Sequence, residues 1–110
     1  MKISIWRLDK TTIFDLSGEI NFVNSPEVRE SVLREIREAH TPRLVLNLSQ
    51  VRYIDSSGIA SLIEGLKASR DLGSRFILIG LSTSAREVLQ LTRLLKVFEI
   101  YENEEQALAS

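Results

Sequence analysis

The hexapeptide Ile54–Ile59, with the sequence Ile-Asp-Ser-Ser-Gly-Ile, is the segment of this chain whose residue types could do chemistry. It follows an apolar run and precedes residues with helical spacing, so Ser56 and Ser57 are expected beside the free N–H groups of a helix N-terminus. The next acidic residue after Asp55 is Glu64, so no carboxylate within the first turns offsets the positive end of the helix dipole. A phosphate group on one of the serines would fill that role.

Two other interpretations of the hexapeptide compete with phosphorylation. In the structural one, Ser56 or Ser57 is only the N-cap of the helix, and Gly58 only allows close backbone packing. In the catalytic one, a serine is the nucleophile of an acyl-transfer enzyme. The catalytic interpretation is disfavoured because Ile54 occupies the position where a Gly-x-Ser-x-Gly nucleophile elbow needs its first glycine. The sole histidine, His40, is also expected in an exposed loop.

Composition excludes several other function classes. Fourteen Lys and Arg against fifteen Asp and Glu give a net charge of -1, which removes the broad attraction that nucleic acids or anionic membranes exert on basic proteins. The absence of cysteine and the presence of one histidine exclude disulfides and disfavour metal sites. No Gly-Lys-Ser or Gly-Lys-Thr phosphate-binding loop occurs, so we expect no catalytic residue, no metal and no cofactor.

Length and hydropathy predict one domain spanning residues 1–110. The chain is 44% hydrophobic, enough for a folded core at this size. Residues 1–10 carry charges around short apolar pieces and do not resemble a signal peptide, and no apolar run approaches the ~20 residues of a membrane span. We therefore expect a cytoplasmic protein that does not insert into membranes.

The chain begins with a pattern typical of an antiparallel hairpin, with strands at Ile3–Leu8 and Thr12–Ser17 and an end at Gly18. Ser25 followed by proline predicts the N-cap of a first helix that runs to about residue 39. The seven charged residues of this helix, Glu35 among them, are expected mostly to face water.

Later segments predict alternating strands and helices. Leu44–Leu48 has almost no polar alternation, which is typical of a strand covered on both faces. Apolar residues at i, i+3, i+4 and i+7 from Ile59 predict a second helix that ends before Gly73. The remaining predicted elements are a strand at Phe76–Ile79, a helix with a Ser84 and Glu87 capping box, a strand at Val97–Tyr101 and a short acidic helix.

The resulting order, ββαβαβαβα, indicates an α/β fold with a mixed, mostly parallel sheet, an opening antiparallel hairpin and flanking helices. Leu46, Ile63 and Leu78 are expected to be buried, because each lies in a continuous strand run or on an apolar helix stripe. In such a sheet the functional crevice lies beyond the carboxyl ends of the parallel strands, which is where the hexapeptide falls.

These segments together resemble a known family. The Asp-Ser-Ser-Gly motif, preceded by Leu44–Leu48 and followed by Gly73–Leu78, is similar to the STAS domain of bacterial anti-sigma factor antagonists. The resemblance covers nearly the whole chain and implies a STAS-type fold. It includes Gly18–Asn21, with the sequence Gly-Glu-Ile-Asn, where the family pattern ends in Asp. Asn21 thus departs from the pattern, although its amide can still form hydrogen bonds.

The resemblance implies that Ser56 is phosphorylated by the anti-sigma factor, which is itself an ATP-dependent serine kinase. The unphosphorylated antagonist binds this kinase and releases the sigma factor, phosphorylation weakens binding, and a PP2C-type phosphatase restores the binding form. Asp55 and Ser57 would hold the site in position, and Gly58 would permit close approach of a partner backbone. The partner-binding residues implied in this way are Gly18, Glu19, Asn21, Asp55, Ser56, Ser57 and Gly58.

One alternative within the same family is a subunit of a lipid or solute ABC transport complex that docks on its ATPase and is never phosphorylated. The serine directly after Asp55 favours the antagonist, because transporter-type relatives often lack a phosphorylatable residue there. A small hydrolase using Ser56 is a more remote alternative. The sequence makes no prediction of oligomeric state.

Overall fold

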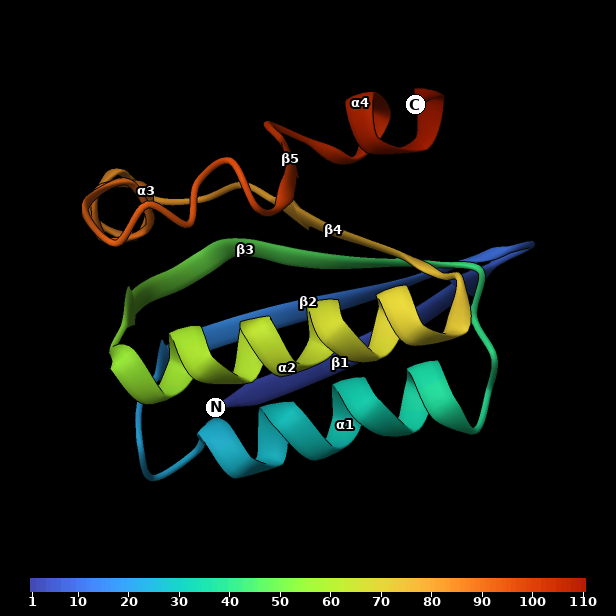
Figure 1. The fold of residues 1–110 in the computed structure, drawn as a ribbon, viewed down its shortest axis with the longest axis horizontal. Coiled ribbons are helices and arrows are strands. Elements are labelled where there is room, and N and C mark those ends of the chain that lie inside the picture. Colours follow the sequence, from blue (N-terminus) through green and yellow to red (C-terminus); the bar gives the residue numbers. More distant parts are fainter.

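The computed structural model describes residues 1–110 as a five-stranded sheet with four helices (Figure 1). The observed order ββαβαβαβα confirms the predicted one. The elements are β1 (Lys2–Leu8), β2 (Thr11–Ile20), α1 (Ser25–Arg37), β3 (Arg43–Ile54), α2 (Ser56–Leu72), β4 (Arg75–Ile79), α3 (Thr83–Leu91), β5 (Glu99–Tyr101) and α4 (Glu104–Ala109).

The sheet has the spatial order β1-β2-β3-β4-β5, so every strand lies beside its neighbour in sequence. β1 is antiparallel to β2, and the remaining neighbours are parallel. This is the mixed sheet with an opening hairpin that the sequence predicts. The helices act as crossovers that return the chain to the same edge before each parallel strand.

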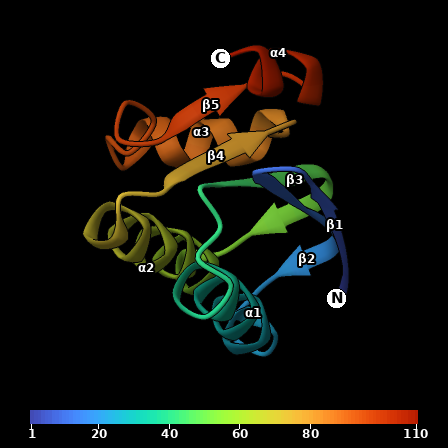
Figure 2. The same cartoon turned by 90° about the vertical axis from the view of Figure 1, so that its right-hand side faces the viewer.

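The core is divided between the two faces of the sheet. Alternate residues of the central strands, such as Leu46 and Leu78, join α1, α2 and α3 in one cluster of 20 buried residues. Their neighbours, such as Val45 and Ile77, face the other side and meet Ala107 of α4. Figure 2 shows α1 and α2 on one side of the sheet and α4 at the opposite side. Central strands are therefore covered on both faces, which confirms the prediction from their continuous apolar runs.

The expected core is confirmed for Leu46 and Leu78, which are fully buried. Ile63 is only partly buried, because it packs at the margin of the larger cluster where α2 still meets solvent. No helix in the structure combines the length and the apolar character that a membrane span requires.

Several predicted boundaries are wrong at the ends of elements. β2 continues past Gly18 to Ile20, because its pairing with β3 extends beyond its pairing with β1. Gly18 adopts φ +120 at a shift in the strand register, a conformation that favours glycine. Asn24, not Ser25, precedes α1, and Ser82, not Ser84, caps α3 by accepting a hydrogen bond from the amide of Ala85 at 3.1 Å.

The last predicted strand is also shorter than expected, since β5 begins at Glu99 rather than Val97. Only three residues of β5 pair with β4, and the first of them is Glu99, so Val97 and Phe98 lie outside the strand.

Glu35 is buried, contrary to the expectation that the charges of α1 face water. Its carboxylate accepts hydrogen bonds from the Arg7 guanidinium and from the hydroxyls of Thr12 and Thr41, the last two at 2.7 Å each. Burial by itself would raise the pKa of the Glu35 carboxyl, but these hydrogen bonds and the Arg7 charge outweigh it and hold the pKa below its ordinary value. The network joins α1 to β1, β2 and the segment before β3.

Candidate functional site

The N-terminus of α2 lies at the carboxyl ends of β2 and β3. Ile20 and Ile54 are partners in the parallel register, and the Asp55 amide donates a hydrogen bond to the carbonyl of Ile20 at 3.0 Å. The two segments singled out in the sequence, Gly18–Asn21 and Asp55–Gly58, are therefore brought side by side. This location is the edge of a parallel sheet where ligand and partner sites commonly form.

Asp55 caps α2, so neither Ser56 nor Ser57 is the N-cap. The Asp55 carboxylate accepts from the amide of Gly58 at 3.0 Å and from the amide of Phe22 at 3.1 Å. The two serines are the first residues within the helix, and their hydroxyls are not needed for capping. The interpretation that a serine serves only as a cap is thus wrong for both.

The two serines differ in exposure. Neither hydroxyl has a hydrogen-bond partner, but Ser56 is exposed and Ser57 is partly buried. The Ser57 carbonyl accepts from the hydroxyl of Ser61 at 3.1 Å, one turn along the helix. Of the two hydroxyls, that of Ser56 is the more accessible to another protein.

A tight turn after β2 is organised by two asparagines. The Asn21 side-chain oxygen accepts from the amides of Val23 and Asn24, at 3.0 and 3.2 Å. The Asn24 side chain accepts from the Asn21 amide at 2.9 Å and donates to the Glu19 carbonyl at 2.6 Å. An aspartate could supply the same accepting oxygen as Asn21, so the departure from the family pattern leaves this turn intact.

Phe22 and Val23 project from this turn and were missed by the sequence reasoning. They are 74% and 72% exposed, although both are large apolar side chains. The Phe22 amide is held by the carboxylate of Asp55, the residue directly before Ser56. An apolar pair held in a hydrogen-bonded turn beside an exposed hydroxyl is a candidate contact surface for a protein. The sequence signal that could have revealed this surface is a pair of adjacent apolar residues between a predicted strand and a predicted helix.

Gly58 is buried against the chain itself. A Cβ atom at this position would lie 2.6 Å from Cγ2 of Ile54 and 2.9 Å from the carbonyl oxygen of Ile20. This glycine therefore permits a close approach between α2 and the ends of β2 and β3. Of the other proposed contact residues, Glu19 is exposed and lies 3.8 Å from the guanidinium of Arg52, while Gly18 is partly buried.

The electrostatics of the site favour an added anion. The first turn of α2 contains no acidic residue, and the Asp55 charge before it is directed at two backbone amides. No group of three or more His, Cys, Asp or Glu residues could hold a metal ion. His40 lies at the far end of β3, after α1, so it is not placed to act as a base for Ser56.

Comparison with known proteins identifies related sequences over nearly the whole chain. The family model of the STAS domain matches residues 2–107. The anti-sigma-B factor antagonist of Listeria monocytogenes is 30% identical over 93 residues, which cover 84% of this chain and 79% of that protein. A Bordetella bronchiseptica protein named as the anti-sigma factor antagonist BtrV is 26% identical over 110 residues, which cover 100% of this chain and 94% of that protein.

The fold is similar to that of a solved relative. The crystal structure of a Thermotoga maritima protein named as an anti-sigma factor antagonist superposes with a TM-score of 0.92 at 25% identity, covering 97% of this chain and 92% of the other. The family resemblance and the fold type inferred from the sequence are both confirmed.

Proposed function

The chain belongs to the STAS domain family, and from this premise we propose that it is an anti-sigma factor antagonist, which binds an anti-sigma factor and thereby frees a sigma factor. The names of the relatives from Listeria and Bordetella support the proposal. The observation that carries it is the exposed Ser56 hydroxyl, free of any capping role, beside the exposed apolar pair Phe22 and Val23. We place this exchange in the cytoplasm, where transcription takes place.

The proposed partner is an anti-sigma factor that is also a serine kinase. Its bound ATP is attacked at the γ-phosphorus by the Ser56 hydroxyl oxygen, the bond to the ADP oxygen breaks, and a base of the kinase takes the hydroxyl proton. A PP2C-type phosphatase then hydrolyses the phosphoserine with water and releases inorganic phosphate. The chain supplies only the acceptor residue, so we infer that it has no enzymatic activity of its own.

Phosphorylation of Ser56 should leave the fold intact. The phosphate adds about -1.5 to -2 charge at pH 7, next to the free amides and positive dipole end of α2. The neighbouring Asp55 carboxylate repels it, but this charge is already bonded to two amides. Because Ser56 is exposed, water continues to solvate the phosphate.

The same phosphate should oppose partner binding. A partner that covers Phe22 and Val23 also removes water from Ser56, since the Asp55 carboxylate joins the two segments. Taking a charged group out of water without a paired cation costs several kcal/mol, and every ~1.4 kcal/mol is a tenfold loss of affinity. The switch therefore acts by local charge at the contact surface.

The test is calorimetric titration of the partner kinase with unphosphorylated protein, phosphoprotein, Ser56→Ala and Ser56→Asp, with Ser57→Ala to show which of the two serines accepts the phosphate. We expect Ser56→Ala to bind like the wild type and to accept no phosphate, and Ser57→Ala to bind and to be phosphorylated. The phosphoprotein should bind at least a hundredfold more weakly, and Ser56→Asp should be weakened less, because a carboxylate only partly imitates a phosphate. Phosphate found on Ser57, or equal affinities throughout, would contradict the proposal, as would stable binding to a transporter ATPase with no phosphate on Ser56.

A further inference from the structure

A pocket with an excess of positive charge lies at the opposite edge of the sheet from Ser56. It has a volume of about 360 Å³ and is formed by the β1–β2 turn, the first residues of β2, β3 and β4, and the end of α4. Three cationic residues line it, Lys10, Arg43 and Arg75. Asp9 is the one acidic residue in the lining.

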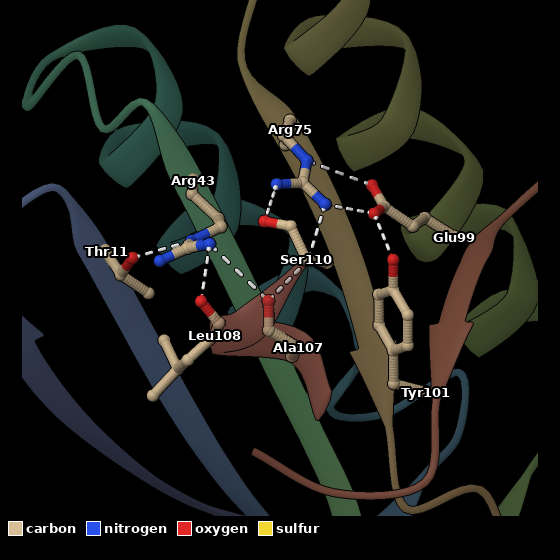
Figure 3. A network of polar contacts seen from close by, with 8 residues as sticks. All are labelled: Thr11, Arg43, Arg75, Glu99, Tyr101, Ala107, Leu108 and Ser110. Carbon is tan, nitrogen blue, oxygen red and sulfur yellow. Dashed lines mark hydrogen bonds and ion pairs between the residues drawn. The ribbon is translucent and has the colours of Figure 1, made fainter. Parts of the chain in front are cut away.

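The strand register places the two arginines next to each other. Thr11 of β2, Arg43 of β3 and Arg75 of β4 are partners in adjacent parallel strands. Figure 3 shows the two guanidinium groups on the same face of the sheet, both directed toward the end of α4. Neighbouring strands are about 4.8 Å apart, so two like charges here need anions close by.

The charge of Arg75 is already matched. Its guanidinium forms an ion pair with the Glu99 carboxylate, which also accepts from the Tyr101 hydroxyl at 2.9 Å. Its Nη1 donates to the carbonyl of Ser110 at 3.2 Å (Figure 3). These contacts occupy most of the donors of Arg75 and attach the end of α4 to the sheet.

Arg43, in contrast, forms no ion pair, although its charge acts on Glu99 at longer range and contributes to the lowered pKa of that carboxyl. Its Nε donates to the Thr11 hydroxyl at 2.7 Å, and its Nη1 reaches the carbonyls of Ala107 and Leu108 at 3.4 Å each (Figure 3). The Nη2 group makes no hydrogen bond, so its two N–H groups are free. The Lys10 ammonium makes no ion pair or hydrogen bond.

We propose that this pocket binds a small phosphate monoester, with the phosphate between Arg43 and Lys10. Counting Asp9 and Glu99 against the three cations leaves a net positive charge in and around the pocket. Phosphate oxygens match both the planar guanidinium and the ammonium, and accept more hydrogen bonds than a carboxylate does. Because Arg43 is partly buried, its unpaired charge is less well hydrated and gains more from an anion.

The rest of the ligand is expected to be apolar and about the size of one ring. Leu8 and Leu108, which are 52% and 37% exposed, line the pocket together with Pro42. The volume is near the lower end of the range for small-molecule sites, roughly 300 to 1,000 Å³. The site is separate from Ser56, so this inference stands independently of the antagonist function.

The test is an NMR titration of the 15N-labelled chain at constant ionic strength, with inorganic phosphate and with phenyl phosphate as probes. We expect saturable shifts of the amides of residues 8–11, 43 and 108, and about tenfold tighter binding of phenyl phosphate than of inorganic phosphate. Lys10→Gln should weaken both probes at least fivefold. Lys67→Gln removes an exposed lysine of α2 and should titrate like the wild type.

Four outcomes of the titrations would overturn the inference. These are shifts that do not saturate, equal behaviour of the two lysine variants, acetate binding as tightly as phosphate, and phenyl phosphate binding no more tightly than inorganic phosphate. A further arm uses sedimentation with vesicles that contain phosphatidic acid. Binding to the vesicles without binding to phenyl phosphate would assign the cations to a lipid surface and contradict the small-ligand site.

Discussion

Replacing Gly58 by alanine tests how α2 is joined to the strands beside the proposed phosphorylation site. The added Cβ would lie 2.6 and 2.8 Å from methyl groups of Ile54 and Ile20, and 2.9 Å from the carbonyl oxygen of Ile20. The methyl groups can shift by rotation, but the backbone oxygen cannot, because it accepts the Asp55 amide at 3.0 Å. The N-terminus of α2 must therefore move away from β2.

The expected cost is a free energy of unfolding lower by about 2 kcal/mol. Overpacking in a filled core costs about 1 to 3 kcal/mol. The better helix propensity of alanine stabilises the folded state by at most about 1 kcal/mol, and by less than that in the first turn of a helix. For 110 residues, the unfolding entropy converts a loss of about 2 kcal/mol into a midpoint about 9 °C lower.

Gly65→Ala is the matched control. Its Cβ would lie 2.8 Å from the Phe76 ring and 2.9 Å from a methyl group of Val32, so it also crowds the core, but away from the start of α2. Thermal unfolding of both variants should show a loss of stability. Hydrogen exchange of the Asp55 amide, measured by NMR, should accelerate beyond the global loss of stability only in Gly58→Ala.

Binding to the anti-sigma factor then separates two roles for Gly58. If the glycine serves internal packing, Gly58→Ala loses stability and also weakens binding, because Ser56 and Phe22 move apart. If it instead admits a partner backbone, affinity falls while the unfolding midpoint stays at the wild-type value. That second result would refute the packing argument, as would a Gly58→Ala variant with unchanged stability and unchanged exchange at Asp55.

Three further predictions follow from contacts elsewhere in the structure. Phe22→Ala and Val23→Ala should each weaken binding of the anti-sigma factor by tenfold or more while leaving the unfolding midpoint unchanged, and a fall in both quantities would show that these exposed side chains stabilise the turn. Glu35→Gln should lower the unfolding free energy by about 1 to 3 kcal/mol at pH 7. Because the folded pKa of Glu35 is lowered, the wild type loses this advantage as the pH falls through that pKa. Unfolding free energies of the two proteins, measured by denaturant titration, should therefore converge at that pH. A difference that stays constant with pH would contradict the ionised network. Leu46→Ala should cost about 2 to 5 kcal/mol and Ile63→Ala clearly less, and an equal loss in urea unfolding would contradict their different burial.

Much of the fold follows from local sequence patterns. Leu44–Leu48 and Phe76–Ile79 show almost no polar alternation, and each lies in a central strand with neighbours on both sides. The spacing from Ile59 onwards predicts α2, and Gly73 ends it in the left-handed conformation at φ 71. These signals depend on residues close in sequence, so the periodicity of apolar residues and local backbone preferences are sufficient to predict these strands and this helix.

The sequence by itself also determined which short segment carries chemistry, but the assignment of roles within it depended on the tertiary structure. Asp55, Ser56 and Ser57 are all good caps, and local propensity does not choose between them. The pairing of β2 with β3 makes Asp55 the N-cap. It places the Asp55 amide on the Ile20 carbonyl, and the Asp55 carboxylate then accepts from the amides of Gly58 and Phe22.

Dependence on tertiary structure also explains why the sequence did not reveal the burial of Glu35 or the pairing of Arg43 with Arg75 across the sheet. Glu35 is one charge among six on α1, and only the packing of α1 against β1 and β2 brings it Arg7 and Thr12. Arg43 and Arg75 are 32 positions apart in the chain, yet the parallel register places them side by side. Contacts between distant residues depend on strand register and helix packing, and these are properties of the whole fold.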